Sequence, residues 1–513
     1  MKVLLINPPI FRVSEPWYDT PPFVRPGLAY IAGYLRQFPE FDIRIIDCKF
    51  ERLNFEETVK LVSDYNPDVV GLCAFTNEIK PAAYLSKLIK KKFPKIVIVV
   101  GGVHITALPE KTLEEFPDVD IGVIGEGEIT FYELCYALKY KKPLSDINGL
   151  SFRKDNEIIV TSPRERILDQ DSIPFPAWDL LPSAGKYIVM TQRGCPFNCV
   201  FCMNPNGRVA RTRSINSVIE ELEMIVENYA PNELMFGDEL FSVEMDRTKQ
   251  LLTEMIKHGL NKKLRWWIQT HVRFVDDEMC QLMKEAGCIR MGLGIETGDE
   301  ESLKTLGKGT NLDMIMKARL AAKKAKLPIE TYFIIGQPNE TTESIRKTIK
   351  LAVKLNPELP IFGIMSPYPG TEIARLAAKG EGGYRLVTTD WDEYNKQIGG
   401  ALEFASLSRK QIEIIQIKAY ASVFLKNYRY KDFLQFLWHY RVGAFSVLKK
   451  IIGIKTKDSF RDVSDPTKII KLNKEGKEII ASATQSWQKW QVTELGRAKK
   501  QKTLHKLQLP KSN

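Results

Sequence analysis

The chain has 513 residues, of which 44% are hydrophobic and 27% charged, a composition that excludes disordered and fibrous proteins and suffices for about three domains. No run of about 18 uncharged apolar residues occurs, and the apolar start Met1–Pro9 is too short for a signal peptide, so we expect a cytoplasmic protein. The net charge of +11 is concentrated at one end, because residues 421–513 carry +13 and the first 420 residues carry −2.

The first 142 residues alternate short β-branched runs with amphipathic segments. Continuous Val/Ile runs between such segments are typical of a parallel sheet covered by helices on both faces, so we expect a doubly wound, Rossmann-like α/β domain over residues 1–142. Ligands of such sheets bind beyond the carboxyl ends of the strands, where small and turn residues occur here. No Gly-x-Gly-x-x-Gly follows the first strand, which argues against a dinucleotide.

The rest of the chain divides into three parts. Residues 143–185 read as a hairpin followed by a Pro-rich linker. Over 186–400, six strand-like runs alternate with helical stretches, which predicts a partial or full parallel β/α barrel with its chemistry at the carboxyl ends of the strands. Residues 401–513 predict a helical, basic C-terminal region that ends in a mobile tail.

Three of the eight cysteines form the motif Cys195-Pro-Phe-Asn-Cys199-Val-Phe-Cys202. In a loop, this spacing lets three thiolates surround one metal centre, one ligand short of a closed four-cysteine site. An iron–sulfur cluster with one open iron fits this count, and a structural zinc site with a distant fourth ligand is the alternative. The other five cysteines are expected to be buried thiols.

This motif, with Phe201 just before its last cysteine, resembles the signature of the radical S-adenosylmethionine enzymes. The resemblance implies a 4Fe-4S cluster held by Cys195, Cys199 and Cys202, whose open iron binds S-adenosylmethionine. It extends to motifs at later strand ends, Phe236-Gly-Asp-Glu239 and Gly294-Ile-Glu-Thr297 among them. The residues it implies for S-adenosylmethionine binding are Phe201, Asp238, Glu239, Gln269 and Glu296.

The first domain is similar to that of the class of these enzymes that binds cobalamin. Runs of small residues at its strand ends would let the nucleotide tail of that cofactor enter the sheet edge. The residues that this resemblance implies for cobalamin binding are Asn7, Pro8, Cys73, Thr76, Gly101, Gly102, His104, Gly125, Glu126 and Gly127. Two departures stand out: the Asp-x-His-x-x-Gly signature of carrier-type cobalamin proteins is absent, and Cys73 stands where those domains usually have serine.

Two histidines near strand ends have more than one interpretation. For His104 we expect a hydrogen-bonded surface group, with a cofactor contact as the alternative. His271 lies where barrel chemistry occurs, although a capping or core role is equally compatible with its position.

The resemblance implies an oxygen-sensitive enzyme that generates a 5′-deoxyadenosyl radical. Among the activities it implies, a cobalamin-dependent methyltransferase acting on an unactivated carbon is the most favoured. A radical cyclase or oxidoreductase without methyl transfer, similar to the anaerobic porphyrin-ester cyclases, is the main alternative. A methylthiotransferase is less favoured, because the N-terminal domain lacks the extra three-cysteine site that such enzymes carry. A non-catalytic cluster or corrinoid carrier is also less favoured, because it would not need the strand-end motifs that this chain retains.

The expected partners are a small-molecule or lipid-like substrate and a reducing electron donor such as flavodoxin or ferredoxin, with no nucleic acid. Aromatic and basic residues alternate over 430–455. A helical cap over the barrel is favoured there, with peripheral membrane contact as the second interpretation.

Overall fold

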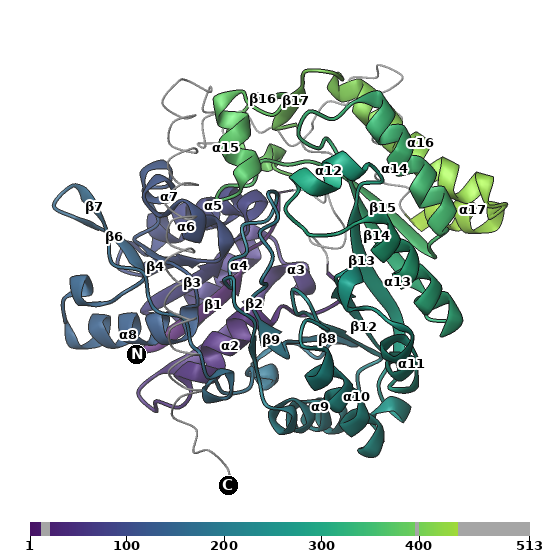
Figure 1. Cartoon of the computed structure of the whole chain (residues 1–513). Helices are drawn as coiled ribbons and strands as arrows, with labels where there is room; N and C mark the ends of the chain where they lie inside the picture. The colour runs from purple at the N-terminus through teal and green to yellow at the C-terminus, as the bar shows by residue number, and fades with distance from the viewer. Residues whose placement is uncertain (12–20, 396–399, 440–513) are drawn as a thin grey trace, which may run out of the picture.

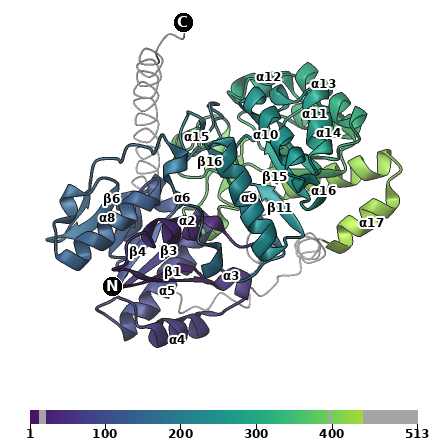
Figure 2. The same cartoon turned by 90° about the horizontal axis from the view of Figure 1, so that it is seen from below.

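The computed structural model describes residues 1–11, 21–395 and 400–439. Two sheets with their covering helices stand side by side, the N-terminal one at the left of Figure 1 and the second at its right, and Figure 2 shows the same division from below. The expected mobile tail and the basic aromatic stretch beyond 439 lie outside the described residues.

The first sheet contains seven strands in the order β2-β1-β3-β4-β5-β6-β7. Its strands are β1 (Lys2–Asn7), β2 (Asp42–Asp47), β3 (Val69–Cys73), β4 (Val97–Gly101), β5 (Ile121–Val123), β6 (Leu150–Lys154) and β7 (Glu157–Val160). The first five run parallel, and their order reverses between β1 and β3, which is the point where doubly wound sheets bind ligands.

Helices cover both faces of this sheet, as the continuous apolar strands require. Alternate residues of β1, such as Leu5 and Leu4, enter two separate cores. One core includes α2 (Pro26–Leu35) and α8 (Gly127–Tyr140), and the other includes α4 (Phe55–Tyr65), α5 (Ile79–Lys92), α6 (Val103–Ala107) and α7 (Pro109–Glu115). A short helix, α3 (Cys48–Glu51), follows β2.

The hairpin expected after the first domain is present and lengthens the first sheet. β6 pairs antiparallel with β5, and β7 pairs antiparallel with β6. The hairpin therefore extends the first sheet by two strands, and β7 becomes its edge strand.

The second sheet is parallel throughout, in the order β15-β14-β13-β12-β11-β8. Its strands are β8 (Lys186–Val189), β11 (Glu233–Phe236), β12 (Trp266–Thr270), β13 (Cys288–Glu296), β14 (Ile329–Ile335) and β15 (Leu359–Ile364). Because β8 and β15 have one neighbour each within the described sheet, the barrel is partial. β9 (Gln192–Arg193) and β10 (Arg211–Thr212) form a small antiparallel pair that frames the cysteine loop.

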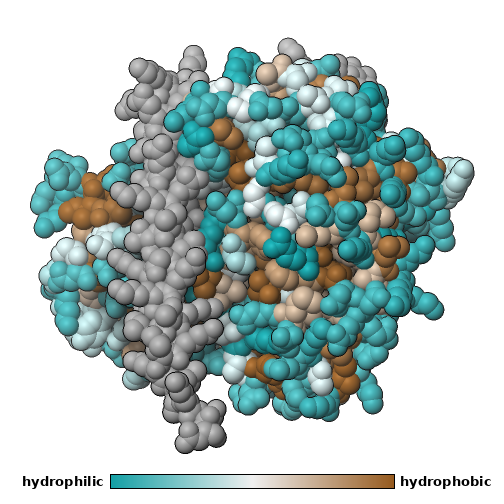
Figure 3. Space-filling model, viewed as in Figure 1, coloured by the Kyte–Doolittle hydropathy of each residue, from teal (hydrophilic) through white to brown (hydrophobic). Residues whose placement is uncertain are grey.

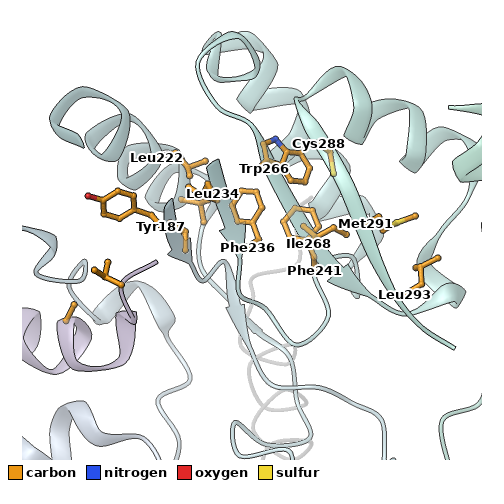
Figure 4. Close-up of a cluster of buried hydrophobic side chains, with 14 of the residues drawn as sticks. Tyr187, Leu222, Leu234, Phe236, Phe241, Trp266, Ile268, Cys288, Met291 and Leu293 are labelled. Carbon is orange, nitrogen blue, oxygen red and sulfur yellow. The ribbon is translucent and has the colours of Figure 1, made fainter. Parts of the chain in front are cut away.

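Helices pack on one face of this second sheet. They are α9 (Ile215–Tyr229), α10 (Met245–Lys257), α11 (Asp277–Glu285), α12 (Glu300–Thr305), α13 (Leu312–Lys324) and α14 (Thr342–Leu355). Phe236, Trp266 and Ile268 point from the strands into the buried layer beneath the helices (Figure 4). On the opposite face, Ile188, Met235 and other side chains are half-buried. The outer helices present a largely hydrophilic surface at the lower right of Figure 3.

The C-terminal part of the described chain returns across both units. α15 (Glu372–Lys379) and the hairpin β16 (Tyr384–Leu386) and β17 (Leu402–Phe404) lie at the top of Figure 1. α16 (Arg409–Lys426) packs against α14 and β15, and α17 (Tyr430–His439) packs against α16. Within the described part of the chain, no helix is long and apolar enough to cross a membrane.

Candidate functional site

The cysteine loop is held between β9 and β10 by hydrogen bonds from its own backbone and neighbours. The amide of Cys195 donates to the carbonyl of Gly207 at 2.9 Å, and the side-chain amide of Asn204 donates to the carbonyl of Cys195 at 2.6 Å. Gly194, which precedes the loop, has φ +97°, and a side chain there would clash with the carbonyl oxygen of Val209. Only glycine fits this turn, so the sequence fixes where the loop begins.

The loop carries three thiol side chains of the kind that hold a four-iron cluster. In the described ranges, no three His, Cys, Asp or Glu side chains form a group able to hold one metal ion. A four-iron cluster takes one thiolate per iron, so its ligands need not converge on a single point. Burial raises the pKa of Cys195 to about 11, although a backbone hydrogen bond from Phe197 opposes the rise.

Two cations lie near the loop, and sequence analysis identified neither. Arg208 donates to the carbonyl of Phe197 and interacts electrostatically with all three cysteines of the motif. Lys308, from the segment between α12 and α13, acts on Cys199, whose pKa burial raises to about 12 while Lys308 opposes the rise. Positive charge beside a cluster of thiolates offsets their negative charge. The signal in the sequence was weak, since Lys308 is 106 residues beyond Cys202 in chain order.

The two predicted carboxylates after β11 differ in their surroundings. Asp238 is 2% exposed, and its oxygens accept from the backbone amide of Thr191 at 2.7 Å, the hydroxyl of Thr191 at 2.6 Å and the amide of Gln192 at 3.2 Å. Burial raises the pKa of Asp238 to about 7 despite these donors. Glu239 is half-buried and accepts from the amide of Gly194 at 3.2 Å and from Asn206. The geometry therefore leaves Glu239 as the more accessible of the two, and makes Asp238 the group that orders the chain entering the cysteine loop.

Glu296, at the end of β13, lies in a strained backbone conformation. Its φ is +67°, and the pairing of β13 with β14 shifts register between Gly294 and Glu296. The amine of Lys308 binds the Glu296 carboxylate and donates to the carbonyl of Gly294 at 2.6 Å. A non-glycine residue in this region costs about 1–3 kcal/mol and persists where the surroundings hold it, as the buried ion pair does here.

Two further pairs of side chains involve the barrel, one joined by a hydrogen bond and one by ring stacking. Gln269, from β12, is half-buried and donates to the hydroxyl of Tyr332 at 3.0 Å. The ring of His271 stacks on Phe197 of the cysteine loop, with centroids 4.4 Å apart. Burial and the charge of Lys308 lower the pKa of His271 to about 3, so it is neutral and serves as a packing surface for the loop. Phe201 is half-buried and packs against the second core.

At the reversal point of the first sheet, the structure leaves space and an unpaired polar atom. The Oδ1 atom of Asn7 is buried and has no hydrogen-bond partner among the described residues, while its Nδ2 donates to Asp47 at 2.6 Å. A side chain at Gly101 or at Gly125 would enter open space. Gly102 has φ +108°, and a Cβ there would lie 2.6 Å from the carbonyl oxygen of Ala74. An amide oxygen without a partner beside an open edge suits a cofactor that carries many amide groups, as cobalamin does.

Buried charges lie beside this edge. Glu78, at the end of the 3-10 turn Thr76–Glu78, forms ion pairs with Arg25 and Lys49. These cations lower the pKa of Glu78 to about 2 although burial opposes them. Burial, with Glu78 adding to it, raises the pKa of the half-buried Cys73 to about 11, so the thiol is protonated at neutral pH.

The remaining predicted residues of the first domain have varied environments. His104 is fully buried, its ring nitrogens have no hydrogen-bond partner in the described structure, and its ring lies edge-on to Trp391. The expectation of a hydrogen-bonded surface group was therefore wrong. Thr76 is buried, Pro8 is buried beside Asn7, and Gly127 begins α8. Both carboxylate oxygens of Glu126 are bound by arginines.

Comparisons with known proteins agree with both halves of this description. Residues 189–352 match the Radical SAM superfamily, and residues 19–135 match the B12 binding domain. An uncharacterized methyltransferase of Pyrococcus horikoshii is 35% identical over 438 residues, covering 83% of this chain and 93% of the relative. The anaerobic magnesium-protoporphyrin IX monomethyl ester cyclase of Rubrivivax gelatinosus is 28% identical over 416 residues, covering 77% of this chain and 72% of the cyclase.

Solved structures give the same fold. The radical S-adenosylmethionine methyltransferase TsrM of Kitasatospora setae, with cobalamin and a [4Fe-4S] cluster bound, superposes with a TM-score of 0.66 at 18% identity. The alignment covers 83% of this chain and 88% of that one. At this identity the likeness establishes the arrangement of the two sheets and their helices.

Proposed function

The chain belongs to the cobalamin-binding radical S-adenosylmethionine enzymes, and from this membership we propose that it is a methyltransferase acting on an unactivated carbon of a small-molecule or lipid-like substrate. Its cofactors are a 4Fe-4S cluster, S-adenosylmethionine and cobalamin. Together they supply a radical that removes an unreactive hydrogen and a cobalt centre that carries a methyl group. A low-potential donor such as flavodoxin or ferredoxin would provide the electrons.

The observation that carries the proposal is the packing of the cysteine loop against the open edge of the first sheet. Met203, directly after Cys202, belongs to the same core as Ile105 and Ala107 of α6, the helix that follows Gly102. A cluster held in this loop and a corrin over Gly101 would thus both border the space between the two sheets. That is the arrangement in which one substrate could meet both cofactors.

Within this proposal each group of residues has its own role. The thiolates of Cys195, Cys199 and Cys202 hold the cluster. The carboxylate of Glu239 would accept hydrogen bonds from the ammonium of S-adenosylmethionine, and Glu296, held by Lys308, would contact the adenosine half. Around this centre Phe201, Gln269 and the His271–Phe197 stack exclude water.

On the other side, the residues of the first sheet receive cobalamin. The amide oxygen of Asn7 would accept from one of its amides, and Gly101, Gly102 and Gly125 leave room for its nucleotide tail. Cys73 and Thr76 border the same edge. The protonated thiol of Cys73 is a poor metal ligand, since cobalt would require the thiolate.

The test is anaerobic reconstitution with iron, sulfide and hydroxocobalamin, followed by addition of S-adenosylmethionine and titanium(III) citrate. We expect about four irons and about one cobalt per chain, and about one equivalent of S-adenosylhomocysteine per cobalt before any substrate is added. Iron and cobalt without S-adenosylhomocysteine would refute methyl transfer.

Cyclisation or oxidation without methyl transfer is the second candidate, favoured by the 28% identity with the magnesium-protoporphyrin ester cyclase. The same experiment separates the two, because a cyclase would release 5′-deoxyadenosine and no S-adenosylhomocysteine. Peripheral membrane contact remains a prediction. It is supported by the exposed apolar side chains of α17, such as Leu434, which is 67% exposed.

A further inference from the structure

Four buried charged residues join the first unit to the cysteine loop. Glu126 and Glu128 follow β5, while Arg193 and Arg211 belong to β9 and β10, the strands that frame the loop. Arg193 contacts Glu126 at 3.3 Å and Glu128 at 2.6 Å, and Arg211 contacts Glu126 at 2.9 Å. All four side chains are at most 10% exposed.

The network continues to the S-adenosylmethionine side. Arg193 is joined through Gly194 to Cys195, and the amide of Gly194 donates to Glu239 at 3.2 Å. Arg211 donates to the carbonyl of Asn206 at 2.9 Å, and the side chain of Asn206 donates to the same Glu239. Two separate routes therefore connect Glu126 with Glu239.

Such a network contributes orientation more than stability. Burying four charges costs desolvation that their mutual attraction roughly offsets, so an apolar cluster of the same volume would hold the units together equally well. Guanidinium groups, however, present their donors in a rigid planar fork that fixes direction. Burial alone would raise the pKa of Glu126, but Arg211 and Arg193 lower it below its usual value, so the carboxylate is charged and accepts from both forks.

We propose that Glu126 and Glu128 are positioning residues that, through Arg193 and Arg211, set the position of the cluster relative to cobalamin. In this role their carboxylates bind the arginines between the two units and do not contact the corrin. This role rests on the binding of both cofactors. It would be the same whether the enzyme transfers a methyl group or catalyses a cyclisation.

The test measures the distance between the two cofactors in the reconstituted holoenzyme. Cobalt(II) and the reduced cluster are both paramagnetic, so pulsed dipolar EPR reports the distribution of distances between them. We expect the double variant Glu126→Gln/Glu128→Gln to bind iron and cobalt like the wild type and to show a distribution at least twice as wide. Arg193→Lys, which keeps the charge and loses the fork, should broaden it to an intermediate degree.

Two controls separate positioning from general stability. Arg36→Gln breaks an exposed pair with Asp179, in which the side chains are 42% and 58% exposed, and should leave the distribution unchanged. Leu222→Ala destabilises the fully buried core under α9 without touching the network, and should also leave it unchanged.

Three results would overturn the proposal. The first is a wild-type distribution in the double variant, or in Arg193→Lys if the double variant does not fold. Loss of cobalt from the folded double variant would instead make the carboxylates cofactor ligands. Broadening in Leu222→Ala equal to that of the double variant would reduce the effect to stability. Absence of S-adenosylhomocysteine in the wild type would refute methyl transfer and leave this measurement intact.

Discussion

The adjacent glycines Gly101 and Gly102 allow the same chemical change to be made in two different environments. Alanine at Gly102 must adopt φ +108° and place its Cβ 2.6 Å from the carbonyl oxygen of Ala74. The backbone strain costs about 1–3 kcal/mol, and the displacement of the end of β3 costs a similar amount. We therefore expect Gly102→Ala to lower the free energy of unfolding by about 2–6 kcal/mol.

Alanine at Gly101 is expected to change stability little and to weaken cofactor binding. The residue ends β4, its φ is not in the left-handed region, and its Cβ would meet nothing within 4 Å. The free energy of unfolding should stay within about 0.5 kcal/mol of the wild type. The added methyl group would, however, occupy the space proposed for cobalamin, and we expect the affinity for hydroxocobalamin to fall about tenfold, or about 1.4 kcal/mol.

Urea unfolding of the apoprotein gives the first quantity, and equilibrium titration with hydroxocobalamin gives the second. The reasoning about the turn fails if Gly102→Ala is as stable as the wild type. The placement of the cofactor fails if Gly101→Ala binds hydroxocobalamin with unchanged affinity.

Three further predictions concern buried groups. Burial lowers the pKa of His104 to about 3 in the folded state, so protonation of the unfolded chain below its ordinary value of 6.5 favours unfolding. Between pH 7 and pH 5 the wild type should thus lose about 2 kcal/mol more than His104→Phe, and equal losses in urea titrations would contradict this. Cys199→Ala should abolish iron binding after reconstitution, whereas the buried Cys48→Ala should retain it; iron analysis decides. Lys308→Met leaves a buried carboxylate unpaired and should weaken S-adenosylmethionine binding about tenfold or more, while Lys304→Met, 75% exposed, should not change the dissociation constant.

The sequence was most informative where one segment determines its own structure. The Val/Ile runs predicted the parallel strands of both sheets. The spacing of Cys195, Cys199 and Cys202 predicted that the three residues lie in one loop, and membership of the family explains that spacing. The turn glycines at Gly101–Gly102 could also be identified, since small residues at strand ends indicate a ligand edge.

Contacts between distant segments were beyond local patterns. Glu126 looked like a cofactor residue because of its Gly-Glu-Gly-Glu motif, and its arginine partners are 67 and 85 residues away. The ring of His104 packs against Trp391, 287 residues away, and the antiparallel pairing of β6 with β5 joins segments that the sequence pattern does not connect. Such pairings follow from the folded arrangement of elements, which periodicity does not specify.

The segment around Trp391 affects how the chain folds during synthesis. Its indole donates to Glu115 at 2.7 Å, and Lys80 bridges Asp390 at 3.0 Å and Asp392 at 2.7 Å, across sequence separations of up to 312 residues. The first domain leaves the ribosome long before these partners exist, so its surface around His104 stays uncovered while the barrel is translated. Contacts of this length are late and slow to form, and the docking of this segment onto the first domain is expected to be among the last steps of folding.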